Sequence, residues 1–486
     1  MSLKKIIIKI ILWIILLIFL GGVFYAGFFL YKLNSFENKI ANPDKPKETV
    51  IDTLKSITTN SSSQLKESSD GRINILLLGI GGKENNAPNL TDTIMIASVN
   101  LKTNQVALLS IPRDLYVTVP TFNVQTKINA VYQLGLNSGS NDAKTIKDTI
   151  KNITGLDINY YAVLNFQGFR DIINAIGGIN ITSDRDIYDA TYPGPNNSYT
   201  IFKLDKGFHH MDGETALKYA RERHDDPQGD FGRAKRQQQI IQATKNKIFS
   251  ASTLFDVFAI NNLVDALGEN IKTDISTQDL DAFYELSKKL DTVNINNVVV
   301  DAWNSNSLLK VSHVDFNGLQ AFVLIPRIAN YSEIQDLAQN IFDLNKIKRK
   351  QAEIAKENAS VTLINQSGDV NILEKIRKLL SKNFGYTKVS ISTDPTKSTI
   401  DTTYAYDLTN GIKPFTLDEL TVKIPAQASY AIPDNYKMIS AKNNPDIIVV
   451  IGKDLIEKYN MAENSIDEFK KSEDQQSYID ITSPKK

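Results

Sequence analysis

Two patterns of hydrophobic and polar positions alternate along the chain from Arg72 to about Phe342. Short apolar runs at 73–80, 93–100 and 105–111 end in glycine or polar residues and predict buried strands. Only LKTN separates the second run from the third, which predicts a strand pair. Further strands are predicted at 160–166, 179–184 and 322–326, and helices at 144–153, 168–178, 254–267 and 277–289. This alternation of strands and helices indicates a layered α/β domain.

The N-terminus has a different pattern. The 22 residues Ile10–Tyr31 carry no charge, and a helix of this length is enough to span roughly 30 Å of hydrocarbon. Lys4, Lys5 and Lys9 precede them and favour a cytoplasmic N-terminus. The alternative is a cleaved signal peptide, but its apolar core would be shorter and no A-x-A-like site follows. We therefore expect a single-pass anchor in the cell membrane, with the bulk of the chain outside the cytoplasm.

Composition divides the chain into six segments. Residues 1–33 form the cytoplasmic N-terminus and anchor, and residues 34–70, rich in serine and threonine, form a flexible stalk. Residues 71–343 form the main α/β domain, and 344–358 a charged, helix-prone linker. Residues 359–456 form a small α/β C-terminal domain that opens with a strand at 361, a helix over 371–383 and a strand at 388–392. Residues 457–486 are a polar tail.

Charge and cysteine content narrow the functional classes. The chain has 55 basic and 55 acidic residues, so it has no overall positive field for nucleic acid, and any anion site must be local. It has no cysteine, which excludes disulfides, thiolate metal sites and cysteine nucleophiles. His209 and His210 lack the spacing of a histidine metal motif, so a structural or surface role is expected for them.

Arginine is concentrated in one segment, Tyr219–Gln237. Of the eleven arginines in the chain, four lie here: Arg221, Arg223, Arg233 and Arg236. Arginine holds phosphate or carboxylate through a planar fork of donors that never loses its charge. Two helices, 211–220 and 231–248, are predicted around the turn DPQGD, capped by Asp212 and Asp230. We interpret the segment as a polyanion clamp; the alternative is a solvated, charged helix surface.

Other candidates lie at predicted strand ends, where α/β sheets commonly bind ligands. Asp92 precedes the second strand, and Arg113 and Asp114 follow the third. A carboxylate beside arginines suits a phosphorylated substrate with Mg²⁺, although Asp92 by itself favours a turn or cap role. Arg113 could equally pair with Asp114, and Lys127 could reach a phosphate or lie in a surface loop. The glycines of LGIGG favour a tight turn over a phosphate cradle.

The residues also match a known family. The stretches LTDTIMIASVN, VALLSIPRDLYV, KINAVYQLG, FQGFRDIINAIGGI and GETALKYARERHDDPQGDFGRAKRQQQII follow in the order and spacing of the LytR-CpsA-Psr family. The resemblance covers about 73–342 and implies an α/β/α sandwich with a central mixed sheet. Residues 361–454 resemble, more weakly, the small LytR-type C-terminal domain often attached to these proteins.

The resemblance implies an enzyme and its site. Such proteins transfer a glycopolymer from a polyprenyl-pyrophosphate carrier to peptidoglycan through a phosphodiester, outside the membrane and with Mg²⁺. By motif, the residues that hold the pyrophosphate are Arg113, Arg221, Arg223 and Arg233, with Asp92 on the metal side. Asp230 and Gln237 match further site residues, and we add Lys127, Arg236 and Asp114 as candidates for substrate binding.

One position departs from the family pattern. Relatives usually carry a second aspartate in the L-G-x-D of the first strand, where this chain has Gly81. We expect Asp92 and the substrate phosphates to suffice for the metal; the alternatives are that Glu84 substitutes or that activity differs. Two other functions stay open, a polyprenyl-pyrophosphate hydrolase and a non-catalytic scaffold that binds lipid carrier or cell wall. A soluble nucleotide-binding enzyme is disfavoured by the anchor.

Overall fold

A computed structural model describes residues 65–459, except 84, 86, 140–142, 195–197, 249–269, 288, 303–306, 317, 329 and 395. The predicted anchor, the stalk to residue 64, the helix at 254–267, the tail from 460 and Glu84 lie outside the described residues. Across the part that is described, no helix combines the length and apolarity needed to cross a bilayer.

A six-stranded mixed sheet forms the centre of the main domain, in the order β11-β6-β1-β2-β3-β12. Strands β1, β2 and β3 pair antiparallel, while β6 pairs parallel to β1 and β12 parallel to β3. The predicted strand pair and the mixed sheet are therefore confirmed. In this order, the strands are β11 (Ile271–Thr273), β6 (Tyr160–Asn165), β1 (Arg72–Ile80), β2 (Thr91–Asn100), β3 (Gln105–Ser110) and β12 (Asp291–Val299).

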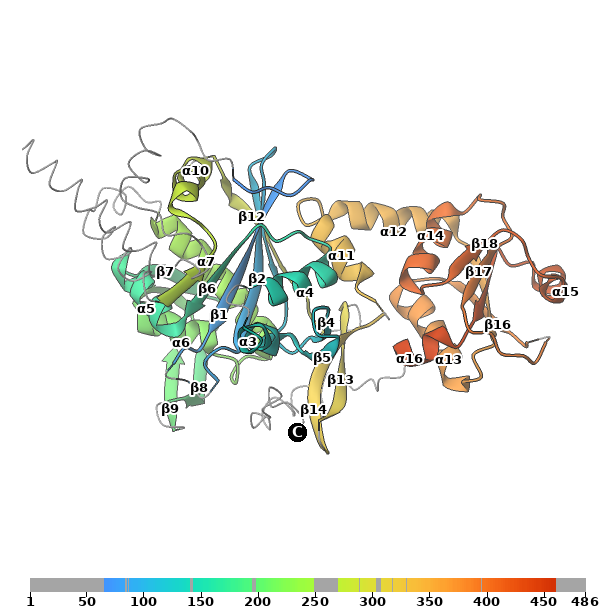
Figure 1. Cartoon of the computed structure of the whole chain (residues 1–486), viewed down its shortest axis with the longest axis horizontal. Coiled ribbons are helices and arrows are strands. Elements are labelled where there is room, and N and C mark those ends of the chain that lie inside the picture. The colour runs from blue at the N-terminus through green and yellow to red at the C-terminus, as the bar shows by residue number, and fades with distance from the viewer. Residues whose placement is uncertain are drawn as a thin grey trace, which may run out of the picture.

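Helices cover both faces of this sheet (Figure 1). On one face, Leu76 and Leu78 of β1 share a core with Ile146 and Ile150. On the other face, Tyr160 packs against Phe283 and the side chain of Gln238 reaches Ser110 of β3. The first face carries α3 (Val131–Asn137), α4 (Lys144–Thr154) and α11 (Ser332–Gln339), and the second carries α7 (Gly229–Ile248) and α10 (Thr277–Ser287).

A second core lies between the helices α5 and α6 and a group of strands outside the central sheet. The predicted strand at 179–184 is β7, but it pairs with β10 rather than joining the central sheet. The strand at 322–326 is likewise part of a separate hairpin, β13–β14. The elements around this second core are α5 (Phe166–Ala175), α6 (Gly213–Arg221), β7 (Ile179–Ser183), β8 (Ile187–Pro193), β9 (Tyr199–Leu204) and β10 (Gly207–Met211). The other elements outside the central sheet are β13 (Leu309–Phe316), β14 (Leu319–Pro326), β4 (Tyr116–Val119) and β5 (Val124–Lys127), the last followed by the 3₁₀ turn Ile128–Ala130.

Residues 360–459 form a smaller α/β unit with its own core and a five-stranded sheet of order β16-β15-β19-β17-β18. The predicted first strand, helix and second strand are confirmed as β15, α13 with the following π-helical turn, and β16. The elements are β15 (Ser360–Asn365), α13 (Val370–Lys378), the turn Leu379–Asn383, β16 (Lys388–Ser392), β17 (Tyr404–Asp407), α14 (Pro414–Lys423), β18 (Gln427–Ser429), α15 (Asp434–Asn443), β19 (Ile447–Ile451) and α16 (Asp454–Tyr459).

The helix α12 (Asn345–Glu357), predicted as a charged linker, joins the two units. It packs against α14, where Glu357 accepts hydrogen bonds from the backbone N–H groups of Phe415 and Thr416. The buried ammonium of Lys423 on α14 also contacts Asp336 of α11 at 3.0 Å. The smaller unit is therefore docked through these polar contacts and through Ile328 and Ile354, which belong to its core. Helices α11, α12 and α14 lie between the two sheets (Figure 1).

Candidate active site

The arginine-rich segment joins α6 to α7. Asp212 caps α6 as predicted, because its carboxylate accepts a hydrogen bond from the backbone N–H of Thr215 at 2.8 Å. The helix ends at Arg221, and Glu222 turns the chain into an extended conformation. The side chain of Glu222 is fully buried, whereas Arg221 and Arg223 on either side are partly exposed. This alternation is that of an extended segment, in which neighbouring side chains point to opposite sides.

Asp230 is the centre of the charge cluster rather than a helix cap. It lies inside the first turn of α7, so the predicted N-cap is wrong. One carboxylate oxygen accepts hydrogen bonds from Arg113 Nε at 2.8 Å and from an Arg233 Nη at 3.0 Å. The other oxygen lies 2.9 Å from Arg233 and 3.9 Å from Arg223. Three guanidinium groups from two separate parts of the chain therefore surround one buried carboxylate.

The strand ends of the central sheet complete the cluster. Arg113 follows β3 and donates to Asp92 Oδ1 at 2.9 Å, at the start of β2. It also lies 3.4 Å from Asp114, so the predicted pairing of these neighbours exists but is longer than the ion pairs of Arg113 with Asp92 and Asp230. Lys127 contacts Asp114 at 2.7 Å, and both are buried, so the surface-loop alternative for Lys127 is wrong.

The charges in this cluster shift the pKa values of its acids. Burial by itself would raise the pKa of Asp230, but the charges of Arg113, Arg233 and Arg223 outweigh it and hold this pKa well below its usual value. Burial would also raise the pKa of Asp92, but the charges of Arg113 and Arg233 outweigh it and lower this pKa. Both acids are therefore ionised at neutral pH, and each helps to hold the arginines in place.

Arg221 has an aromatic environment instead. Its guanidinium lies over the ring of Phe166 at 4.4 Å and near the ring of Tyr192 at 5.6 Å. Tyr192 was missed by the sequence reasoning, because it belongs to the hairpin β8–β9, and nothing in its own neighbourhood marks it. The guanidinium lies over Phe166 and also hydrogen-bonds the side chain of Tyr192, so an anion would meet its remaining donors.

Arg236 has partners other than Asp230. Arg236 is buried and donates to the backbone oxygens of Tyr219 and Glu222, and it pairs with the carboxylates of Glu222 and Asp226. These contacts occupy its fork, so the structure gives it a place in the packing between α6 and α7 rather than beside the other arginines. The Gln237 amide donates to the backbone oxygen of Ala220 at 3.3 Å.

Burial decides between the two interpretations of the arginine segment. Arg233 and Arg236 are only 7 % and 6 % exposed, so the solvated-surface alternative is wrong for both. Arg223, with 21 % of its side chain exposed, is the most open of the three guanidinium groups around Asp230. An anion approaching the cluster therefore meets this side chain more readily than the two buried behind it.

Comparison with known proteins shows the family of the chain. The model of the LytR_cpsA_psr family matches residues 29–324, more than half of the chain. The chain belongs to this family. It is 32 % identical to a protein of Enterococcus faecalis named polyisoprenyl-teichoic acid–peptidoglycan teichoic acid transferase TagU, over 47 % of this chain and 70 % of that protein. It is 30 % identical to the protein of that name from Oceanobacillus iheyensis, over 56 % of this chain and 77 % of that one.

A crystal structure of B. subtilis TagV aligns with a TM-score of 0.44 and 25 % identity, covering 57 % of this chain and 99 % of that one. The family match ends at residue 324, before β15 begins. The assignment of residues 359–456 as a LytR-type C-terminal domain therefore stays a prediction, as do the boundaries of the stalk and the tail.

The departure from the LytR-CpsA-Psr pattern at Gly81 has a local explanation. The Asn85 amide donates to the backbone oxygen of Gly81 at 2.6 Å. A Cβ atom at Gly81 would come within 2.9 Å of the Asn85 side chain. The asparagine therefore occupies the space that a side chain at position 81 would need, and a carboxylate there would require it to move.

The carboxylates of the site are compatible with a metal ion that is also bound by the substrate. Among the described residues, no three acidic, histidine or cysteine side chains gather closely enough to hold a metal by themselves. Asp92 is nevertheless 26 % exposed, and within the same residues only its Oδ1 oxygen receives a side-chain donor. Mg²⁺ is commonly held by one or two carboxylates together with substrate phosphates and water. Asp92 offers such a ligand, and the donor set fits a substrate-bridged Mg²⁺.

The lowered pKa values predict a pH dependence of stability. A carboxyl group whose pKa is lower in the folded protein stabilises the fold above its ordinary pKa, which is 3.8 for aspartate. This contribution is lost as the pH falls from there through the folded value. Asp92→Asn should therefore flatten the fall in unfolding free energy between pH 4 and 2, by up to about 1.4 kcal/mol per pH unit. Denaturant titrations across this range measure it, and identical slopes would contradict the assigned charge of Asp92.

Proposed function

We propose that this protein is a membrane-anchored phosphotransferase, which moves a glycopolymer from a polyprenyl-pyrophosphate carrier onto peptidoglycan through a phosphodiester bond. The observation that carries the proposal is the meeting of Arg113, Arg223 and Arg233 around Asp230, beside the partly exposed carboxylate of Asp92. The names of the curated relatives, teichoic acid transferases that use polyisoprenyl carriers and peptidoglycan, support the same reaction.

The arginines stabilise charge on the pyrophosphate. A sugar hydroxyl of peptidoglycan attacks the phosphorus on the sugar side, a new P–O bond forms, and the bond to the polyprenyl phosphate breaks. Negative charge increases on the leaving phosphate and on the oxygens of the attacked phosphorus. Arg223 is the most open donor for these oxygens, and Arg113 and Arg233 are held in place behind it by Asp230.

The proton of the attacking hydroxyl has to pass to a carboxylate. Asp230 is the weaker candidate because its pKa is held well below the usual value by three arginines, which makes it a poor base. Asp114, which contacts Lys127 and Arg113, is the candidate that remains. In this assignment Asp230 positions the arginines and does not itself take the proton.

Mg²⁺ would be held by Asp92 together with the phosphates of the substrate. When bound, it neutralises the developing charge on the phosphate oxygens. Arg113 donates to one oxygen of the same carboxylate, and Arg233 donates to the backbone oxygen of Asp92 at 3.2 Å. These contacts would hold the Asp92 side chain in place for the metal.

This assignment predicts a specific metal defect. Asp92→Asn removes the charge but keeps the shape, so it should raise the Mg²⁺ concentration needed for half-maximal turnover by roughly 10–100-fold. The measurement is a Mg²⁺ titration of the initial rate for both proteins. An unchanged titration midpoint would show that Asp92 does not hold the metal.

We further propose that the 22 apolar residues before the stalk hold the enzyme in the cell membrane, with its site outside the cytoplasm. The polyprenyl tail of the donor is confined to the bilayer, so a tethered enzyme meets it without diffusing away. The peptidoglycan acceptor lies on the same outer side. The proposal involves no nucleic acid.

The reaction in water labelled with ¹⁸O tests the proposed chemistry. Transfer to a sugar hydroxyl leaves no label in the saccharide phosphate, and release of polyprenyl phosphate depends on added peptidoglycan oligomer. Labelled saccharide phosphate, formed at the same rate with and without acceptor, would identify a hydrolase instead. Donor binding with no release under either condition would identify a scaffold.

A further inference from the structure

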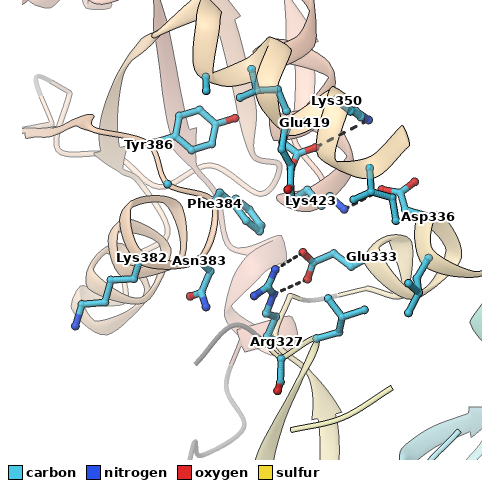
Figure 2. A pocket seen from close by; sticks show the side chains of 18 of the residues that line it. Arg327, Glu333, Asp336, Lys350, Lys382, Asn383, Phe384, Tyr386, Glu419 and Lys423 are labelled. Atoms are coloured by element: carbon cyan, nitrogen blue, oxygen red, sulfur yellow. Dashed lines mark hydrogen bonds and ion pairs between the residues drawn. The ribbon is translucent and has the colours of Figure 1, made fainter. Parts of the chain in front are cut away.

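A cavity of about 860 Å³ lies where the smaller unit docks on the main domain, away from the arginine cluster (Figure 2). Its walls come from the end of β12 and from helix α11 of the main domain, from α12, and from the segment 382–387 and α14 of the smaller unit. The volume is within the range of roughly 300–1,000 Å³ that is usual for sites of small ligands.

The charged groups that line this cavity balance one another. Four are basic and four acidic, so their formal charges sum to zero. Arg327 makes a two-point ion pair with Glu333, at 2.8 and 2.6 Å, and Lys423 pairs with Asp336 at 3.0 Å. These charges are occupied by their partners. The cavity is therefore polar but offers no field that would select an anion or a cation.

One polar group in the wall lacks a hydrogen bond within the described residues. The hydroxyl of Tyr386, a residue only 7 % exposed, has no hydrogen-bond partner there. In Figure 2 this hydroxyl points toward the side of the cavity where Glu419 lies. Glu419 is 8 % exposed, and its carboxylate lies 4.0 Å from the ammonium of Lys350, beyond hydrogen-bond distance. Leaving a buried hydroxyl unpaired costs about 1–3 kcal/mol, so a ligand that bonds to Tyr386 gains affinity.

The same wall also presents an aromatic surface. Phe384 is half-buried, lies near the guanidinium of Arg327 at 5.9 Å, and is drawn between Arg327 and Tyr386 in Figure 2. Burial raises the pKa of Tyr386, so its hydroxyl keeps its proton and can both donate and accept. Burial also raises the pKa of Glu419, and the nearby charges of Lys423 and Lys350 offset only part of this shift.

We propose that this cavity binds a segment of an uncharged saccharide chain, with sugar hydroxyls bonded to Tyr386 and Glu419 and a sugar ring against Phe384. Vicinal hydroxyls supply donors and acceptors together, which is what one phenol and one carboxyl group require. The C–H face of a sugar ring is apolar enough to cover the aromatic ring. A phosphate-rich chain fits less well, because the balanced charges of the lining offer no net attraction to offset the cost of removing its phosphates from water.

Such a chain could belong to the wall glycan or to the sugar portion of the donor, since both present hydroxyl-rich rings. The site would then hold one of the two polymers at a second point, away from the reacting phosphate. This goes beyond the proposed transfer reaction, and it gives the smaller unit a function in binding.

Calorimetric titration of the full-length protein, kept in a detergent without a sugar headgroup, tests the proposal. The ligands are an N-acetylglucosamine tetramer, a plain glucose tetramer and an anionic glycerol-phosphate oligomer. We expect the neutral tetramers to bind and the anionic oligomer not to bind. A preference for the N-acetylglucosamine tetramer would indicate the wall glycan, and equal binding of both tetramers would indicate a sugar chain of more general type.

Tyr386→Phe should weaken binding of the tetramers roughly tenfold while leaving the melting temperature unchanged or higher, because the lost hydroxyl has no partner among the described residues. Tyr459→Phe is the matched control: Tyr459 is also a buried tyrosine of the smaller unit, but it does not line the cavity. Arg223→Ala should bind the tetramers normally, which separates this result from the transfer reaction. Absence of binding by either neutral tetramer, equal affinity in Tyr386→Phe and the parent protein, or tighter binding of the anionic oligomer would each overturn the proposal.

Discussion

Replacing Arg223 by alanine should reduce glycopolymer transfer by roughly 10²–10³-fold while the fold stays intact. Arg223 is the most exposed arginine around Asp230 and lies 3.9 Å from its carboxylate, further away than Arg113 or Arg233. Its guanidinium is therefore the best placed of the three to meet phosphate oxygens. Initial rates and thermal unfolding of the same preparation measure the two effects.

Two matched variants make the Arg223 result interpretable. Arg223→Lys keeps the charge but loses the two-point fork, so part of the rate should return. Arg349→Ala removes an arginine that is 61 % exposed and pairs with Asp343, far from the cluster, and should change neither rate nor stability. Full transfer activity in Arg223→Ala would exclude this arginine from the phosphate site.

Replacing Arg236 should have the opposite effect, with a large loss of stability. Its partner Glu222 is fully buried, and Arg185 at 3.1 Å would be the remaining cation beside it. Removing one partner of a buried ion pair commonly costs about 3–5 kcal/mol. Arg236→Met, which keeps most of the apolar stem, should lower the unfolding free energy by this order in denaturant titrations.

A second substitution, at Glu222, tests whether charge or packing causes the loss of stability in Arg236→Met. Burial raises the pKa of Glu222, so the fold favours its neutral form. Glu222→Gln in the Arg236→Met background should therefore recover part of the lost stability, since it removes the buried Glu222 charge that Arg236 no longer neutralises; the loss at Asp226 remains. If the double variant is as unstable as Arg236→Met alone, the loss comes from packing rather than from charge.

These two arginines illustrate how far the sequence could lead. The concentration of arginine in one segment predicted a clamp. The prediction of a helix before it, capped by Asp212, was also correct. The sequence could not show that Arg223 faces the open side while Arg236 is occupied by Glu222 and Asp226. That difference depends on how α7 packs against the turn after α6, which no local pattern records.

Asp230 shows the same limit more sharply. Local chemistry made it a helix cap, because aspartate before an amphipathic stretch is usually one. Its actual partner Arg113 lies 117 residues earlier and is brought to it by the end of β3. The strands themselves were predictable from their apolar runs, whereas the partners of each charged residue follow from the tertiary arrangement. For the same reason, β7 was predicted as a strand but its place outside the central sheet was not.

The most direct test is turnover of a synthetic polyprenyl-pyrophosphoryl saccharide by the full-length protein, with a peptidoglycan oligomer and with Mg²⁺ present or chelated. Mass spectrometry of the products would identify the bond that forms. The proposed function predicts a saccharide joined to the peptidoglycan oligomer by a phosphodiester, formed with Mg²⁺ and absent with chelator. Tight binding of the donor with no joined product in the presence of Mg²⁺ would contradict it.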